Sequence, residues 1–330
     1  MAIHVIRRVW LVSMSFTVLG TGSSVPELCL SNKDMTQFFE TSDEWITTRT
    51  GIKTRRLCTS ESVSSMAVEA AGKALENAAV SPDKIDLIIA TTLTGEYVTP
   101  SLSCIINGEI GTNCPCFDIN AACTGFLYAL NAADAYFMAG KAEYILVVSS
   151  EEMSKFANWT DRSTAVLFGD GAGACVLKRA DEKFISVFET QSNIEVLNIP
   201  SPYGNFPYNK KERREPYLIM KGQEVFRFAV TSMTEGIKKA CASAGLTQQD
   251  VDYVLVHQAN MRIIKAAQSR LEIDACKYLT NIDKTGNTSS SSIPILLDEE
   301  NRKNRFKRGD IIALSAFGGG LTNAACIIKW

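Results

Sequence analysis

Cys123 is the side chain of this sequence best suited to act as a nucleophile. It lies in the segment DINAACTGFLYALNAADAYFMAG (118–140), where an apolar stretch turns near Asn120 and enters an amphipathic helix. The positive end of a helix dipole stabilises a thiolate and lowers the pKa of a thiol. We therefore predict a reactive cysteine at the start of this helix. The simpler alternative is a small structural residue in an alanine-rich turn.

His257 is the second residue that could take part in catalysis. It follows the apolar run VDYVLV, which predicts a buried strand, and open α/β sheets place functional loops at the ends of such strands. Gln258 and Asn260, which come next, could orient or bind a substrate. The other histidine, His4, lies in a segment that we expect outside the fold. A histidine after a strand is more often structural, so His257 gains weight only beside Cys123.

Two turn-forming segments add an amide side chain and accessible backbone. TGNTSSSSIP (285–294) predicts a tight turn that presents Asn287 before a helix. FGGGLTN (317–323) has three consecutive glycines, whose backbone N–H groups can approach a substrate closely. Each segment taken alone is also an ordinary loop.

The elements that would position these residues occur twice along the chain. MAVEAAGKALENAAV (66–80) predicts a helix, and SPDKIDLIIATT (81–92) predicts a turn followed by a buried strand. The same order returns in VTSMTEGIKKACASAGL (230–246) and TQQDVDYVLVHQ (247–258). When the two segments are aligned, Asp86 corresponds to Asp252. This repetition indicates two α/β units with one plan.

A second repeat follows later in each unit. GDGAGACVLKR (169–179) and FGGGLTNAACIIKW (317–330) both lead from a glycine turn into a continuous apolar strand, as expected for strands buried on both faces. A chain of 330 residues also suits two similar domains. We predict an N-terminal half at 14–185 with the cysteine and a C-terminal half at 186–330 with the histidine and asparagine. Chance similarity of two helix–strand units is the alternative.

Two stretches fall outside this repeat. Residues 1–13 superficially resemble a signal peptide, but their apolar run is short and no cleavage site follows it, so we expect an N-terminal extension that is not part of the fold. The interval from 190 to 217 contains four prolines, which exclude a regular helix or central strand. We expect a long surface loop there, and such loops are often functional.

The overall composition excludes several classes of protein. A net charge of −2 gives no general attraction to nucleic acid or to an anionic membrane surface. No segment approaches the roughly 18 uninterrupted apolar residues of a membrane span. The ten cysteines show no disulfide framework, and Cys114 and Cys116 have no second pair at zinc-binding spacing. We predict reduced thiols in a cytoplasmic enzyme without a metal site.

Taken together, the sequence resembles the β-ketoacyl-acyl-carrier-protein synthase III family of the thiolase superfamily, over nearly the whole chain from about residue 16. The motifs, in the family's order, are TSDEWITTRTGI (41–52), NAACTGF (120–126), FGDGAG (168–173), VHQAN (256–260), GNTSSSS (286–292) and FGGG (317–320). The resemblance implies the thiolase fold, an α/β fold in which two duplicated halves form a five-layered α-β-α-β-α core.

The family pattern implies a catalytic triad of Cys123, His257 and Asn287. Cys123 would accept the acyl group of an acyl-CoA and release CoA. Malonyl-acyl-carrier-protein would then lose carbon dioxide, and its enolate would attack the acyl-enzyme to give a 3-oxoacyl-acyl-carrier-protein. His257 and Asn287 would stabilise the enolate oxygen, while the backbone N–H groups of Cys123 and Gly319 would form a separate oxyanion hole. The resemblance implies no metal or redox cofactor, since the CoA thioesters are substrates.

The resemblance also assigns substrate and partner contacts. Trp45 and Arg162 would enclose the CoA adenine, and Arg49 would bind phosphate, because a planar cation suits both tasks. The pantetheine tunnel would be lined by Phe226, Asn260 and Phe317, and the acidic carrier protein would be held by Arg227, Arg262 and Arg270. The resemblance further implies a homodimer.

This sequence departs from the family at the acyl pocket. Thr99 stands before Pro100, where well-known members have a bulky aromatic that reaches into the partner subunit's pocket. The proline-rich segment 198–216 also matches poorly. Both regions bear on primer choice, so the product could be an ordinary fatty acid or a specialised aromatic, branched or polyketide-type compound.

Three other interpretations remain open. Chalcone-synthase-type enzymes use CoA-bound extenders, and hydroxymethylglutaryl-CoA synthases add a catalytic glutamate; HQAN and GNTS favour synthase III over both. A non-catalytic carrier-binding subunit, such as a chain-length factor, would lack the nucleophile. Because Cys123 is present, this last interpretation is disfavoured.

Overall fold

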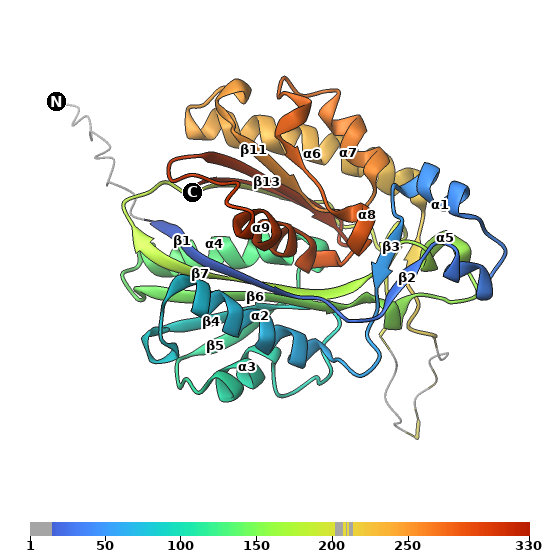
Figure 1. Ribbon diagram of the computed structural model, residues 1–330, viewed down its shortest axis with the longest axis horizontal. Helices are drawn as coiled ribbons and strands as arrows, with labels where there is room; N and C mark the ends of the chain where they lie inside the picture. Colours follow the sequence, from blue (N-terminus) through green and yellow to red (C-terminus); the bar gives the residue numbers. More distant parts are fainter. Residues whose placement is uncertain (1–14, 202–206, 209, 211–213) are drawn as a thin grey trace.

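Two five-stranded sheets form the framework of the protein (Figure 1). The computed structural model describes residues 15–201, 207–208, 210 and 214–330. The first sheet has the order β1 (Ser15–Ser24), β7 (Asp170–Ala180), β6 (Tyr144–Glu152), β4 (Leu87–Thr91) and β5 (Cys116–Ile119). The second has the order β8 (Ile185–Thr190), β14 (Thr322–Lys329), β13 (Ile311–Gly318), β11 (Tyr253–Val256) and β12 (Tyr278–Leu279).

The two sheets have the same topology. In the first, β1, β7 and β6 pair antiparallel, and β6, β4 and β5 pair parallel. In the second, β8, β14 and β13 pair antiparallel, and β13, β11 and β12 pair parallel. The glycine-led segments of the sequence repeat become β7 and β14, which occupy equivalent positions.

Matching hydrogen bonds extend this likeness to single residues. The backbone N–H of Asp86 donates to the carbonyl of Tyr144 at 2.9 Å, and that of Asp252 donates to the carbonyl of Ile311 at 2.9 Å. The Asp86 carboxylate accepts from the N–H of Tyr144, as the Asp252 carboxylate does from the N–H of Ile311. Each aspartate thus aligns a central strand with its neighbour, as the sequence pairing of the two residues predicts.

Helices cover and separate the sheets in five layers (Figure 1). On the outer face of the first sheet lie α2 (Val63–Ala78) and α3 (Leu102–Ile110). Between the sheets lie α4 (Gly125–Met138) and α9 (Ser292–Arg302), and on the outer face of the second lie α6 (Gly222–Ala244) and α7 (Met261–Gln268). Gly22 permits close packing of β1 on α2, because a Cβ there would lie 2.2 Å from the Ala70 carbonyl oxygen.

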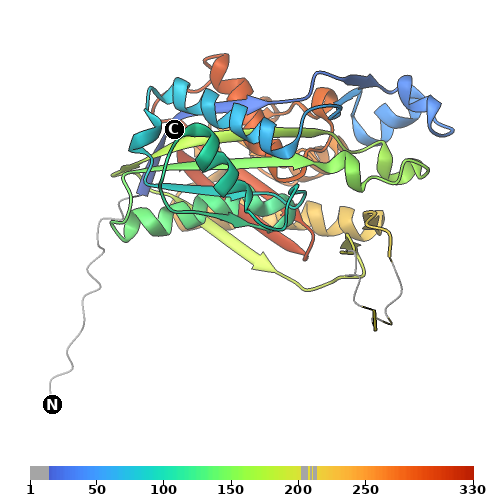
Figure 2. The same cartoon turned by 90° about the horizontal axis from the view of Figure 1, so that it is seen from below.

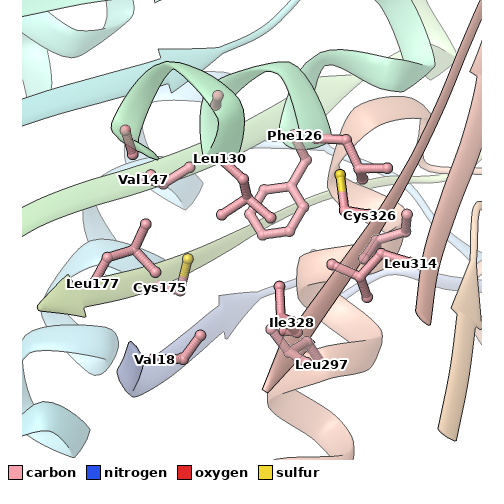
Figure 3. Close-up of a cluster of buried hydrophobic side chains, with 14 of the residues drawn as sticks. Val18, Phe126, Leu130, Val147, Cys175, Leu177, Leu297, Leu314, Cys326 and Ile328 are labelled. Carbon is pink, nitrogen blue, oxygen red and sulfur yellow. The ribbon is translucent and has the colours of Figure 1, made fainter. Parts of the chain in front are cut away.

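The middle layer is the largest apolar contact between the halves (Figure 3). Phe126 and Leu130 of α4 point into a cluster that includes Leu177 from the first sheet and Leu314 from the second. All four side chains are buried. Burial of apolar surface is the main stabilising contribution to folding, so this layer holds the two halves together.

Shorter elements complete the described part of the fold. They are β2 (Cys29–Ser31), α1 (Asp43–Thr50), β3 (Thr54–Arg56), α5 (Arg162–Ala165), β9 (Leu197–Asn198), β10 (Ile219–Met220) and α8 (Ile282–Thr285). Figure 2 shows the blue segment that contains α1 at the end of the molecule away from the C-terminus. β9 pairs with β10 across the proline-rich interval. None of the described helices is long and apolar enough to cross a membrane.

Two predictions about the ends of the halves stay predictions. Residues 1–13 lie outside the described residues, so the structure does not test the N-terminal extension. The first sheet uses residues up to Ala180 and the second begins with Ile185, which is compatible with a division near residue 185.

Leu130→Ala should lower the free energy of unfolding by about 2–5 kcal/mol, because it leaves a cavity in the layer that joins the sheets. Met138→Ala on the same helix is the matched control, since Met138 is 61% exposed. Urea unfolding followed by circular dichroism measures both. Equal, small losses in the two variants would contradict the packing described for α4.

Candidate active site

Cys123 lies in a tight turn between β5 and α4. The turn is a 3₁₀ helix (Ala122–Thr124), and Ala122 has a left-handed φ of 47°, a conformation uncommon for residues other than glycine. The Thr124 hydroxyl closes the turn by donating to the Ala121 carbonyl at 2.6 Å. A Cβ on Gly125 would lie 2.1 Å from the Thr91 hydroxyl oxygen, so only glycine lets α4 begin this close to β4.

The surroundings of the Cys123 sulfur correct one sequence-based expectation. The Ser289 hydroxyl donates to Sγ at 3.4 Å. Burial nevertheless raises the pKa of the Cys123 thiol to about 12, and the Glu151 charge adds to the rise. The prediction of a lowered pKa was wrong because the turn excludes water from the sulfur, and because α4 begins two residues later, at Gly125. Part of the residue still faces the adjoining cavity.

His257 follows β11 and is buried, with 1% of its surface exposed. Its Nδ1 lies 2.7 Å from the Ser292 hydroxyl oxygen, which also accepts the backbone N–H of Gln258 at 3.3 Å. The ring of Phe317 packs against the imidazole, with 5.4 Å between the two ring centres. Burial lowers the pKa of His257 to about 3, so the ring is neutral at ordinary pH. Nε2 has no hydrogen-bond partner among the described residues.

Asn287 is fixed through both its backbone and its side chain. Its N–H donates to the Leu167 carbonyl at 2.8 Å, and its carbonyl accepts from Gly169 at 3.1 Å. Its side-chain Oδ1 accepts the N–H of Ser289 at 2.9 Å. Because the amide oxygen is held in this way, the orientation of the side-chain amide is fixed, and Nδ2 is the donor available to a ligand.

One cavity of about 1720 Å³ joins these three residues. Its walls include most of the residues that the sequence assigns to substrate or carrier protein: Trp45, Arg49, Phe226, Arg227, Asn260, Arg262, Phe317 and Gly319. The described ends of the proline-rich interval, at Leu197–Ser201 and at Pro216, also line it. Thr99, Arg162 and Arg270 do not.

The glycine run approaches Cys123 closely from the second sheet. A Cβ on Gly318 would lie 2.9 Å from the Cys123 backbone nitrogen. A Cβ on Gly319, which the sequence assigns to the oxyanion hole, would lie 3.7 Å from the Ala122 Cβ and 3.8 Å from the Leu197 carbonyl oxygen. The role of the Gly319 N–H group stays a prediction.

The three residues assigned to the CoA nucleotide lie together. The guanidinium of Arg49 lies 4.7 Å and that of Arg162 lies 5.0 Å from the centre of the Trp45 ring. Arg162 also donates to the Glu40 carbonyl at 2.9 Å. Arg162 therefore contacts Trp45 directly, and an adenine between the two would require one of them to move.

Asn260 connects two helices at the cavity wall. Its side-chain oxygen caps α7 by accepting the N–H of Arg262 at 2.8 Å, and its Nδ2 donates to the Arg49 carbonyl at 3.1 Å. The Arg262 guanidinium lies 5.7 Å from the centre of the Phe226 ring. Arg227 is exposed on α6, and Arg270 is exposed beyond the end of α7.

Thr99 is exposed and lies beside two exposed apolar residues. Tyr97 is 62% exposed, Val98 is fully exposed, and both line the cavity. The predicted role of Thr99 concerns the pocket of a partner subunit, so the single chain leaves it a prediction.

Sequence reasoning missed several buried polar residues next to the triad. Ser289 contacts Cys123, Ser292 contacts His257, and Ser290 contacts the fully buried Glu151. The serine run after Asn287 and the acid at the end of the apolar strand YILVVSSEE were the available signals. Among the described residues, no cluster of His, Cys, Asp or Glu is suited to a metal ion, and the ten cysteines are free thiols.

Comparison with known proteins gives consistent matches. Residues 117–194 match the family model of 3-oxoacyl-[acyl-carrier-protein] synthase III, and residues 241–330 match the model of its C-terminal part. The β-ketoacyl-[acyl-carrier-protein] synthase III of Clostridium acetobutylicum is 42% identical, over 96% of this chain and 99% of that protein.

Solved structures agree with these matches. The synthase III of Aquifex aeolicus is 41% identical with a TM-score of 0.88, over 96% of this chain and all of that one. The priming β-ketosynthase of the R1128 polyketide pathway is 36% identical with a TM-score of 0.90, over 96% of both chains. The predicted thiolase fold is thereby confirmed, and the chain belongs to the 3-oxoacyl-[acyl-carrier-protein] synthase III family.

Proposed function

We propose that this enzyme condenses an acyl-CoA with malonyl-acyl-carrier-protein, releasing CoA and carbon dioxide and giving a 3-oxoacyl-acyl-carrier-protein. The observation that carries the proposal is that Cys123, His257 and Asn287 line one cavity in a chain of this family. That cavity is large enough for a CoA thioester, because ligand sites of drug size measure about 300–1,000 Å³.

In the first half-reaction the Cys123 thiolate attacks the thioester carbonyl of the acyl-CoA. The acyl–sulfur bond to CoA breaks, and CoA leaves as its thiol. Because burial keeps the free thiol protonated, its proton must pass to the departing CoA sulfur as the new acyl bond forms, and the unpartnered Nε2 of neutral His257 is the proposed carrier. This requires the imidazole proton on Nδ1, donated to the Ser292 hydroxyl. The backbone N–H groups of Cys123 and Gly319 hold the oxyanion.

In the second half-reaction malonyl-acyl-carrier-protein loses carbon dioxide, and its enolate carbon attacks the acyl carbonyl on Cys123. The new carbon–carbon bond forms as the acyl–Sγ bond breaks, and Cys123 leaves as a thiolate that takes up a proton to give the free enzyme. Here Nε2 of His257 and Nδ2 of Asn287 donate to the enolate oxygen. Nε2 carries the proton when the Ser292 hydroxyl donates to Nδ1. The hydroxyl can take either role, since it rotates, so one imidazole serves both half-reactions.

The substrate contacts follow the same division. Arg49, Trp45 and Arg162 bind the CoA nucleotide, and Phe226, Asn260 and Phe317 line the path of the pantetheine arm. The carrier protein docks on the exposed cations Arg227, Arg262 and Arg270. Rim charges of this kind act mainly on the rate of association with an acidic partner.

The enzyme acts in the cytoplasm as a homodimer built from two-part subunits, with residues 14–185 and 186–330 as the halves and residues 1–13 outside the fold. The exposed and adjacent Tyr97 and Val98 support a contact with a second copy, since contiguous exposed apolar surface marks protein–protein interaction sites. In that dimer Thr99 faces the acyl pocket of the partner subunit.

A second candidate function differs in the primer. The similarity to a priming β-ketosynthase of a polyketide pathway favours a specialised starter unit. The reaction class and the roles of the triad are the same in both cases.

Within the triad, His257→Ala and Asn287→Ala should still accumulate acyl-Cys123, while malonyl decarboxylation falls by about 10²–10³ because one donor to the enolate is lost. Loading should slow further in the His257 variant, since it also loses the proton acceptor. Intact-protein mass and carbon dioxide release from labelled malonyl-carrier protein are measured in parallel, with Cys123→Ala as the control. Acylation as completely absent in both variants as in that control would show the division of roles to be wrong.

Thr99→Phe should reduce turnover of longer or bulkier primers more than turnover of acetyl-CoA, because a larger side chain shortens the partner's pocket. Thr59→Phe is the control, since Thr59 is another exposed threonine and does not line the cavity. Steady-state rates with a series of acyl-CoAs measure the effect. A uniform loss over all primers would contradict the placement of Thr99.

A further inference from the structure

Glu151 is a fully buried carboxylate close to Cys123 that the reaction described above does not use. It lies near the end of β6, and among the described residues it forms no ion pair with a lysine or arginine. A buried charge without a cation is costly unless several donors satisfy it. The retention of an acid here therefore needs an explanation.

Each oxygen of the carboxylate faces a different part of the molecule. Oε2 accepts from the backbone N–H of Leu93 at 3.1 Å and from the hydroxyls of Thr94 at 2.9 Å and Thr92 at 3.3 Å. Oε1 accepts from the Ser290 hydroxyl at 2.5 Å. Thr92 and Leu93 line the cavity, whereas Ser290 belongs to the 3₁₀ turn Ser289–Ser291 that follows Asn287.

The Ser289–Ser291 turn depends on such an anchor. Ser289 has a left-handed φ of 51°, which costs free energy in a residue other than glycine and persists only where the surroundings hold it. This same residue donates its hydroxyl to Cys123 Sγ and its N–H to Asn287 Oδ1. A shift of the turn would therefore displace two members of the triad at once. The Ser290 hydroxyl also lies 2.8 Å from that of Ser149 on β6.

We propose that Glu151 is a positioning residue for the condensation. Its carboxylate connects two parts of the site: the Ser289–Ser291 turn, which contacts Cys123 and Asn287, and the cavity wall at Thr92–Thr94. The proposal rests on the function proposed above. Glu151 does not touch the substrate, and it acts through Ser290 and Ser289.

The charge of Glu151 gives the proposal a second readout. Glu151 on β6 acts electrostatically on Cys123 before α4, whereas burial alone lowers the pKa of His257 after β11, and the adjacent Glu152 faces Lys155 at 3.8 Å. Burial is the main cause of the raised pKa of the Cys123 thiol, and the carboxylate charge of Glu151 adds to it, while burial also raises the pKa of Glu151 itself. Loss of the charge therefore makes the thiol easier to ionise, whatever its effect on turnover.

Two variants separate the anchor from the charge. Ser290→Ala removes the link and keeps the carboxylate, so kcat should fall about 10-fold with little change in KM for the acyl-CoA, as expected for loss of a hydrogen bond to a charged group. Glu151→Gln removes the charge and can keep the link, since the Ser290 hydroxyl can turn to accept from an amide. Its midpoint for alkylation of Cys123 by iodoacetamide, followed against pH by peptide mass spectrometry, should move to lower pH.

Asp298→Asn is the matched control, because Asp298 is another buried carboxylate and accepts from Thr21, Ser23 and Arg302 away from the cavity. It should lower the melting temperature without changing kcat or the alkylation profile. A wild-type kcat in Ser290→Ala, or a wild-type alkylation profile in Glu151→Gln, overturns the proposal. The alkylation result needs no malonyl substrate, so a protein that alkylates as expected but does not condense would contradict the proposed function while leaving the electrostatic link between Glu151 and Cys123 in place.

Discussion

Backbone from both halves must meet at Cys123, and the arrangement of the site depends on this constraint. Gly318 of the second sheet packs so closely on the Cys123 nitrogen that a Cβ would not fit between them. Gly125 packs in the same way on Thr91 of the first sheet. Gly169 packs in the same way on the carbonyl of Thr285, just before Asn287. These contacts place the three candidate catalytic residues on one cavity although they come from distant parts of the chain. The buried layer of α4 and α9 holds the sheets at the separation that the contacts need.

The same close packing determines the protonation states of the site. Exclusion of water favours the neutral forms of both the thiol and the imidazole, which is why the pKa of Cys123 rises and that of His257 falls. A neutral imidazole suits the enolate step, because it offers a hydrogen bond without adding a positive charge. In the acylation step, by contrast, the proton of the neutral thiol must move. The Ser292 hydroxyl beside Nδ1 makes either tautomer of His257 available for this. The turn that holds Cys123 therefore fixes the position of the thiol and also keeps it protonated.

The sequence was sufficient to predict the repeated plan of the fold. The sequence repeats an apolar strand, at 87–91 and at 253–256, with an aspartate before it. Both aspartates are present because each of them aligns its parallel strand with the neighbouring strand. Cys123, His257 and Asn287 were assigned together through the family resemblance of the motifs around them, because each residue taken alone also suited a structural role. The raised pKa of Cys123 could not be predicted, because it depends on how tightly segments far apart in the chain enclose the sulfur. Glu151 was missed for the same reason: an acid at the end of a strand is usually solvated, and only the fold shows that Ser290 and Thr94 surround it.

We expect Cys123 to carry the acyl group while the two halves of the chain supply the rest of one site. Intact-protein mass spectrometry after incubation with a panel of acyl-CoAs, without malonyl-acyl-carrier-protein, tests this most directly. We expect one acyl group per chain, located on the peptide that contains Cys123, lost on addition of malonyl-acyl-carrier-protein, and absent in Cys123→Ala. An acyl group found on another residue, or condensation that continues in Cys123→Ala, would contradict this expectation.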